Sequence, residues 1–125
     1  MALIRCSFTS AVLMRDCAMH IFVPETPHSD GRPGFPVLYL LHGRSGDHSA
    51  YARYGIRKFC RGRECIVVMP DAARSFYTDM VAGDKYWTFV SEELPRLIQT
   101  MFPARSGRDQ TFAAGLSMGG YGALK

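Results

Sequence analysis

The chain has 125 residues, 47% hydrophobic and 21% charged, with no low-complexity tract, which is typical of a globular domain and excludes an intrinsically disordered protein. Its net charge is +4, and the densest basic stretch, residues 53–63, holds only Tyr54 and Phe59 as stacking residues, so we expect a solvated helix face and no nucleic-acid partner. No metal-ligand spacing, signal-peptide pattern or membrane-length apolar run is present, so we expect no metal, no membrane span and a cytoplasmic location with reduced thiols.

The first third of the chain predicts a hairpin, a loop and a buried strand. Polar and apolar residues alternate loosely over residues 7–23, which predicts a β-hairpin that turns at Arg15 and Asp16. Residues 24–36 contain four prolines and two glycines and predict a loop. The continuous apolar run 37–41 is too short for a helix and predicts a strand buried on both faces of a parallel sheet.

Helices and strands alternate over the rest of the chain. Residues 49–61 predict a helix with Tyr54 and Phe59 facing inward, residues 65–69 a second buried strand, and residues 111–115 a third. This alternation indicates right-handed crossovers and a mainly parallel α/β sheet with helices on both faces.

An amphipathic helix is predicted between the second and third buried strands. Apolar residues recur at spacings of three and four over residues 86–101. Pro95 falls inside this pattern and should kink or restart the helix after a turn at residues 91–93. We interpret Tyr86 and Trp87 as helix packing or a pocket wall.

A G-x-S-x-G motif follows the last strand. Gly115 and Gly119 flank Ser117, and a helix begins directly after it. A serine on a tight strand-to-helix turn needs such small neighbours, and its hydroxyl then projects beyond the carboxyl end of the sheet. We therefore predict that Ser117 is a catalytic nucleophile and that the backbone N–H of Met118 stabilises the oxyanion.

The second oxyanion donor should come from the loop that follows residues 37–41. Within this loop the backbone N–H of Arg44 is the predicted donor, and His42 and Gly43 are predicted to support the loop. His42 is disfavoured as the general base, because the order in this fold is serine, then an acid, then histidine. Asp71 follows a proline and is interpreted as a turn former.

Six stretches, in order along nearly the whole chain, resemble the esterase family that holds tributyrin esterases, esterase D and S-formylglutathione hydrolases. The stretches are residues 36–43 (PVLYLLHG), 68–71 (VMPD), 74–79 (RSFYTD), 86–88 (YWT), 92–95 (EELP) and 114–125 (AGLSMGGYGALK). The stretch 74–79 is most similar to the bacterial tributyrin esterase branch.

The resemblance implies an enzyme of the α/β-hydrolase fold that hydrolyses short-chain acyl esters without a cofactor. It implies that Ser117 is the nucleophile, that the backbone of Arg44 and Met118 forms the oxyanion hole, and that the acid and the histidine lie beyond this chain. The family commonly carries an apolar residue where Arg44 stands and glycine where Ala72 and Ala73 stand.

On this resemblance residues 1–125 form one incomplete domain, the N-terminal half of the fold, truncated after the nucleophile turn. The strand 111–115, central in the complete fold, would then be an exposed apolar edge. A serine without its base retains only the oxyanion hole and substrate binding. We therefore expect the 125-residue chain alone to be unstable or aggregation-prone and close to inactive.

Three functions stay open from the sequence. The first is a serine carboxylesterase that forms an acyl-enzyme on Ser117 with a small-molecule acyl ester. The second is an S-formylglutathione hydrolase, which would apply the same groups to a thioester; acyl transfer to an alcohol is disfavoured because no secretion signal is present. The third is a non-catalytic, truncated relic. The sequence also leaves open a homo-oligomer of the full-length protein.

Overall fold

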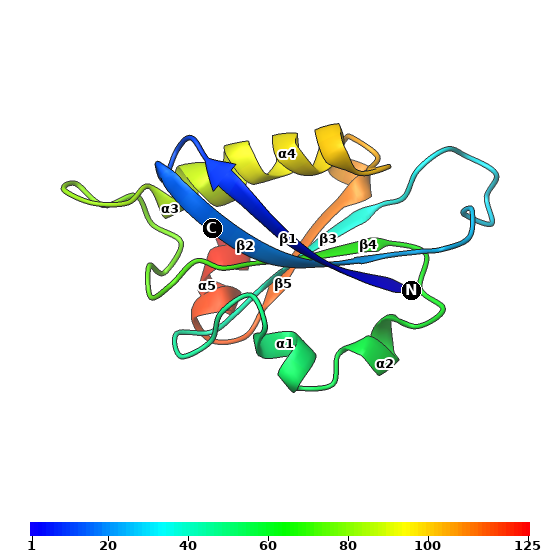
Figure 1. The fold of residues 1–125 in the computed structure, drawn as a ribbon, viewed down its shortest axis with the longest axis horizontal. Helices are drawn as coiled ribbons and strands as arrows, with labels where there is room; N and C mark the ends of the chain where they lie inside the picture. Colours follow the sequence, from blue (N-terminus) through cyan, green and yellow to red (C-terminus); the bar gives the residue numbers. More distant parts are fainter.

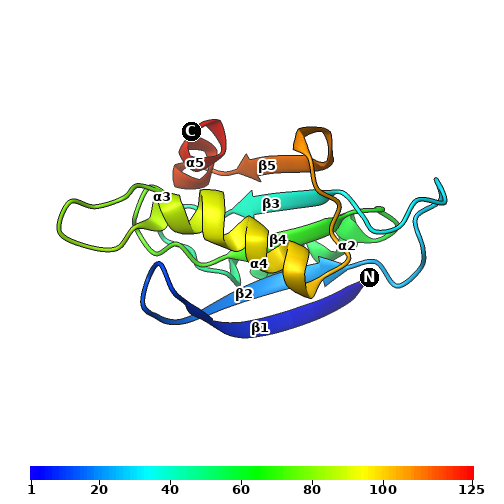
Figure 2. The same ribbon diagram turned by 90° about the horizontal axis from the view of Figure 1, so that it is seen from above.

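A five-stranded mixed β-sheet forms the centre of the protein, for which a computed structural model describes all 125 residues. The strands lie in the order β1-β2-β4-β3-β5 (Figure 2). Their bounds are β1 Ala2–Ser10, β2 Arg15–Val23, β3 Val37–Leu41, β4 Ile66–Pro70 and β5 Thr111–Gly115.

The three strands predicted as buried form the parallel part of this sheet, although β5 is largely exposed because it lies at the edge. Strand β3 pairs with β4 on one side and with β5 on the other, both in parallel. Residues 66–69 of β4 are at most 2% exposed, as a strand covered on both faces requires. The predicted α/β class is therefore confirmed, and the carboxyl ends of β3, β4 and β5 meet at one edge.

The hairpin of β1 and β2 is antiparallel throughout, and β2 also pairs antiparallel with β4. Its turn spans residues 11–14, so the predicted turn at Arg15 and Asp16 is wrong, because both residues already lie in β2. The carboxylate of Glu93 explains the difference. It accepts hydrogen bonds from the backbone N–H of Ala11 at 2.8 Å and of Val12 at 3.1 Å, which fixes the turn upstream.

Helices cover both faces of the sheet (Figure 1). On one face lies a continuous helical run, whose Leu94 and Ile98 belong to the same buried cluster as Ile21 and Val68 of the sheet. On the opposite face two short helices pack Cys60 against Val67. The run comprises α3 (Tyr86–Thr88), η1 (Phe89–Glu93) and α4 (Leu94–Met101), and the short helices are α1 (Ala50–Arg53) and α2 (Arg57–Cys60).

Both predicted helices differ in detail from expectation. Pro95 lies in the first turn of α4, but residues 91–93 belong to the π-helical η1 that leads directly into α4, so the predicted turn and restart are wrong. A proline has no N–H for the regular ladder, and a widened π turn before it accommodates that gap. The predicted helix 49–61 is interrupted at Gly55, where φ is 76°.

Two further details concern exposure. Tyr54 and Phe59 are 63% and 62% exposed, so the prediction that they face inward is wrong. Strand β5 is an edge strand with Phe112 53% exposed, so the expected apolar edge is confirmed. None of the helices has the length and apolar character needed to cross a lipid bilayer.

Candidate active site

Ser117 occupies a strained turn between β5 and α5 (Met118–Leu124). Its φ of 57° and ψ of −115° lie outside the regions that a residue with a side chain normally adopts. A methyl group on Gly115 would overlap the backbone of Gly119, and one on Gly119 would overlap the carbonyl of Leu41. The two glycines of the motif therefore allow α5 to fold back directly against β5 and β3.

Residues 42–47, here called the His-Gly loop, leave β3 beside this turn. A methyl group on Gly43 would lie 3.3 Å from the carbonyl oxygen of Leu116 and 3.8 Å from Cβ of Ser117. The backbone N–H of Arg44 has no hydrogen-bond acceptor within the chain. The N–H of Met118 belongs to the first turn of α5, where no helix carbonyl can accept it. Two amide donors thus lie in the segments that border the serine.

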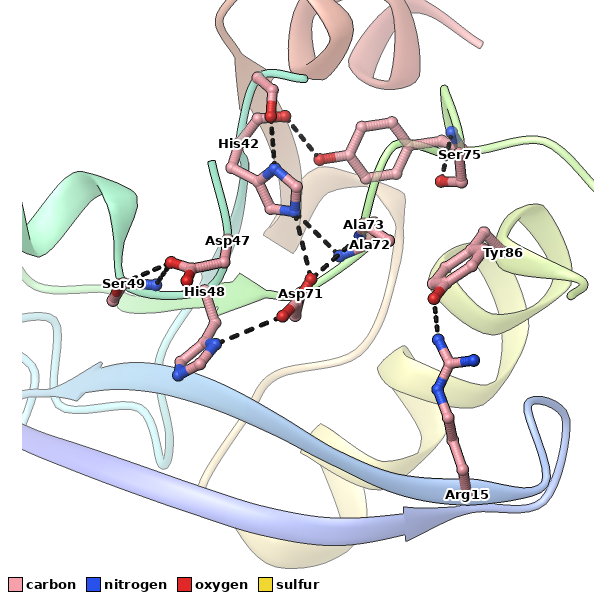
Figure 3. Close-up of polar contacts among 12 residues, drawn as sticks. Arg15, His42, Asp47, His48, Ser49, Asp71, Ala72, Ala73, Ser75 and Tyr86 are labelled. Atoms are coloured by element: carbon pink, nitrogen blue, oxygen red, sulfur yellow. Dashed lines mark hydrogen bonds and ion pairs between the residues drawn. The ribbon is translucent and has the colours of Figure 1, made fainter. Parts of the chain in front are cut away.

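His42 is 1% exposed and fastens the His-Gly loop to the end of β4 (Figure 3). Its Nδ1 lies 2.6 Å from the carbonyl oxygen of Gly43, and its Nε2 accepts the N–H of Ala72 at 2.9 Å. Both ring nitrogens are therefore occupied by the backbone. The hydroxyl of Ser117 forms no hydrogen bond within the chain, with His42 or with any other group, which agrees with a supporting role for His42.

The sequence predicts only a turn at Asp71. In the structure its carboxylate does accept a hydrogen bond from the backbone N–H of Ala73 at 2.9 Å, as such a turn requires. It also lies between two histidines, 3.7 Å from Nε2 of His42 and 3.6 Å from Nδ1 of His48 (Figure 3). The contact with His42 is the main reason why the pKa of Asp71 is lowered. Burial alone would lower the pKa of His42, but contact with Asp71 and Gly43 raises it above the ordinary value.

The far end of the His-Gly loop is fixed by Asp47. Its Oδ1 accepts hydrogen bonds from the backbone N–H of Ser49 at 2.8 Å and from the Ser49 hydroxyl at 2.6 Å. Arg53 of α1 adds an ion pair at 3.3 Å. These bonds, led by that of the Ser49 hydroxyl, lower the pKa of Asp47 to about 2. The loop that carries Arg44 is thus anchored at both ends.

The Ser117 pocket, a cavity of about 370 Å³, lies between the His-Gly loop and the serine turn. Sequence reasoning missed three side chains on its wall, because no motif marks them: Tyr51, Tyr54 and Arg74. A larger cavity of about 680 Å³ lies between the hairpin and Tyr86 and reaches Asp71, but it contains no part of the serine turn. Tyr86 is a wall of that second cavity. We assign the candidate site to the Ser117 pocket because it holds the nucleophilic hydroxyl.

Comparison with known families and sequences gives one consistent result. The family described as Putative esterase matches residues 10–125. An esterase of Mycobacterium tuberculosis strain H37Rv is 33% identical over 125 residues, which cover 94% of this chain and 27% of that protein. The acetyl esterase of Caldicellulosiruptor saccharolyticus is 31% identical over 135 residues, which cover 100% of this chain and 50% of the enzyme.

Solved structures agree with the sequence comparison. Fluorophosphonate-binding serine hydrolase F of Staphylococcus aureus superposes with a TM-score of 0.88 at 32% identity, covering 97% of this chain and 49% of that one. The S-formylglutathione hydrolase of Staphylococcus aureus gives a TM-score of 0.83, also at 32% identity and with the same coverage. The chain therefore spans about half the length of these enzymes.

Proposed function

This chain belongs to the esterase family, a family of ester hydrolases, and we propose that Ser117 is the nucleophile of a serine carboxylesterase acting on short-chain acyl esters. One observation carries the proposal. Ser117 is held at a φ of 57° on a strand-to-helix turn, facing a pocket that the His-Gly loop borders. A strained backbone persists only where the surrounding structure imposes it, and such positions concentrate at active sites.

The proposed reaction proceeds through an acyl-enzyme. The Ser117 oxygen attacks the carbonyl carbon of the ester, and its proton passes to a general base. The negative charge that develops on the carbonyl oxygen is stabilised by the backbone N–H groups of Arg44 and Met118. The bond to the alcohol oxygen then breaks, and the alcohol leaves with the proton. Water attacks the acyl-enzyme, releases the carboxylic acid and restores the serine.

The supporting residues have separate parts in this proposal. Gly115 and Gly119 permit the close turn, and His42 and Gly43 hold the loop that carries Arg44. Both ring nitrogens of His42 contact backbone groups, and neither forms a hydrogen bond with the Ser117 hydroxyl. We therefore propose that the base and its acidic partner are those of the complete hydrolase fold, of which this chain spans about half.

A thioester substrate is the second candidate. It is supported by the similarity to the S-formylglutathione hydrolase of Staphylococcus aureus, at 32% identity and a TM-score of 0.83. The same serine and amide donors would serve both reactions, because each passes through a tetrahedral oxyanion. Comparing kcat/KM for an acyl ester with that for the matched thioester separates the two candidates.

The test is covalent labelling with a fluorophosphonate probe, followed by mass spectrometry of the peptide that contains Ser117. It is performed on the 125-residue chain and on a version extended to the length of the structural neighbours. Ser117→Ala is the negative control. Ser45 is an internal comparison, because its exposed side chain lines the same pocket but lies on an ordinary loop.

Labelling of Ser117 in the extended version, and weak or no labelling of the shorter chain, is the expected result. A folded extended version that stays unlabelled would overturn the nucleophile assignment and favour a non-catalytic relic. Modification of Ser45 in place of Ser117 would equally contradict the proposal.

A further inference from the structure

Two arginine side chains border the pocket of the proposed nucleophile. Arg44 comes from the His-Gly loop at the end of β3, and Arg74 comes from the loop that follows β4. Both are exposed to solvent. No aspartate or glutamate lies on the wall of this pocket, so the two guanidinium groups give it a positive charge that no lining residue offsets.

Neither arginine is occupied by an ion pair elsewhere in the chain. Other arginines of this protein do have carboxylate partners: Arg15 with Asp84 at 2.6 Å and Arg105 with Asp30 at 2.8 Å are examples. No carboxylate lies within 4.0 Å of Arg44 or Arg74, and neither side chain forms a hydrogen bond within the chain. Within this chain, their donors are therefore unoccupied.

The backbone beneath Arg74 is fixed. On its N-terminal side the N–H of Ala72 binds Nε2 of His42 at 2.9 Å, and Ala73 has a φ of 47° that its hydrogen bond to Asp71 supports. On its C-terminal side the buried hydroxyl of Tyr77 donates to the carbonyl of His42 at 2.9 Å. Both arginines thus start from loops that are joined to each other through His42.

We propose that Arg44 and Arg74 make this site selective for esters that carry an anionic group, a carboxylate or a phosphate, on the acyl chain or on the alcohol. A guanidinium group donates several hydrogen bonds in a planar fork that matches such an anion. The inference rests on the proposed function, because it concerns the substrate of Ser117. It also goes further, since it names the charge of the substrate and the side chains that select it.

The experiment uses the version extended to the length of the structural neighbours and measures the rate of Ser117 labelling by two phosphonate probes that differ in one group. One probe ends in a carboxylate, and the other ends in the methyl ester of that carboxylate. A second pair places the same difference on the leaving group, which separates selection on the acyl side from selection on the alcohol side. The variants are Arg44→Gln and Arg74→Gln, with Arg57→Gln as a matched loss of one exposed positive charge outside the pocket.

The readout is the labelling rate of the anionic probe divided by that of the neutral probe. A general loss of reactivity or folding in a variant lowers both rates equally and therefore leaves this ratio unchanged. We expect the anionic probe of at least one pair to react faster, and each pocket variant to lower the ratio by about tenfold, whereas Arg57→Gln leaves it unchanged. The preference should also shrink as salt rises from about 0.05 M to about 0.5 M, because exposed charges are screened.

Different results overturn different statements. Equal rates for both members of both pairs would refute the anionic selectivity and leave Ser117 as the nucleophile. If Arg57→Gln lowers the preference for the anionic probe as much as the pocket variants do, the proposed role of the two pocket arginines is also refuted, because the net charge of the protein would then be the cause. Absence of labelling by all probes in a folded extended version would overturn the proposed function itself, and this inference with it.

Discussion

The ring of Tyr77 occupies the space that a side chain on Gly122 would need. A Cβ atom on Gly122 would lie 2.5 Å from Cδ2 of the ring. Tyr77 is fully buried, and its hydroxyl donates to the carbonyl oxygen of His42 at 2.9 Å. This one side chain therefore connects the helix that follows Ser117 with the loop that carries Arg44.

The first prediction concerns this contact. Gly122→Ala should lower the free energy of unfolding by about 2 kcal/mol, because the added methyl group forces the ring or the helix to move. In a Tyr77→Leu background the same substitution should cost markedly less, since the ring is absent. Urea unfolding of the original protein, the two single variants and the double variant gives the coupling energy between residues 77 and 122. Equal costs in both backgrounds would show that the contact does not determine the packing of α5.

The second prediction concerns the buried carboxylate that fixes the hairpin turn. Glu93 is 3% exposed and accepts hydrogen bonds from the Ser10 hydroxyl and from two backbone N–H groups of the turn. Glu93→Gln leaves one oxygen for three donors, so unfolding free energy should fall by about 2 kcal/mol. The neighbouring exposed Glu92→Gln is the matched control and should change it by less than about 0.5 kcal/mol. Similar effects of both variants would contradict this explanation of the turn.

The hairpin also shows where sequence reasoning ends. The three parallel strands could be predicted because apolar runs are local signals, and the serine turn because a five-residue motif encodes it. The turn at residues 11–14 contains no glycine, proline or asparagine, and its position depends on Glu93, 82 residues from Ala11. No local sequence pattern can predict this long-range contact between Glu93 and the turn.

The same limit applies to the site. Ser117 and the His-Gly loop were found because each lies in a recognisable local context at the end of a buried strand. Arg74 and Tyr51 reach the same pocket only through the way β4 and α1 pack beside β3. The position of Asp71 between two histidines likewise depends on the order of the strands, which the sequence does not state.

The third prediction concerns the strain at Ser117, whose φ is 57°. Glycine adopts such a backbone without steric penalty, whereas alanine does not. Ser117→Gly should therefore be more stable to urea than Ser117→Ala, by about 1 kcal/mol, and neither variant should be labelled by a fluorophosphonate. Equal stability of the two variants would mean that the turn carries no strain that glycine relieves.

The last prediction concerns His20, which lies in β2 at 6% exposure with a buried Nδ1 that has no hydrogen-bond partner. Burial is the main reason why its pKa is lowered, and the nearby His48 ring and Arg5 lower it further, whereas Asp47 acts in the opposite direction. The folded protein therefore binds a proton at His20 less readily than the unfolded chain does. The contribution of His20 to the free energy of unfolding is therefore fully present above about pH 6.5 and falls as the pH drops toward the lowered pKa.

His42 and Asp71 also contribute to the pH dependence of the unfolding free energy, each in a known direction. The raised pKa of His42 contributes stability that is complete below about pH 6.5 and is lost as the pH rises through that pKa, which opposes the trend from His20. The lowered pKa of Asp71 contributes stability above about pH 3.9, so it is nearly constant at neutral pH. His20→Leu removes one titration and leaves the other two.

We expect the unfolding free energy of His20→Leu to decline less steeply than that of the original protein between about pH 7 and about pH 5. At about pH 8 the variant should be at least as stable, because it also removes the unpaired ring nitrogen. Chemical denaturation across this range measures both quantities. Parallel profiles for the two proteins would show that His20 does not cause the acid sensitivity, and a steeper decline in the variant would reverse the predicted sign.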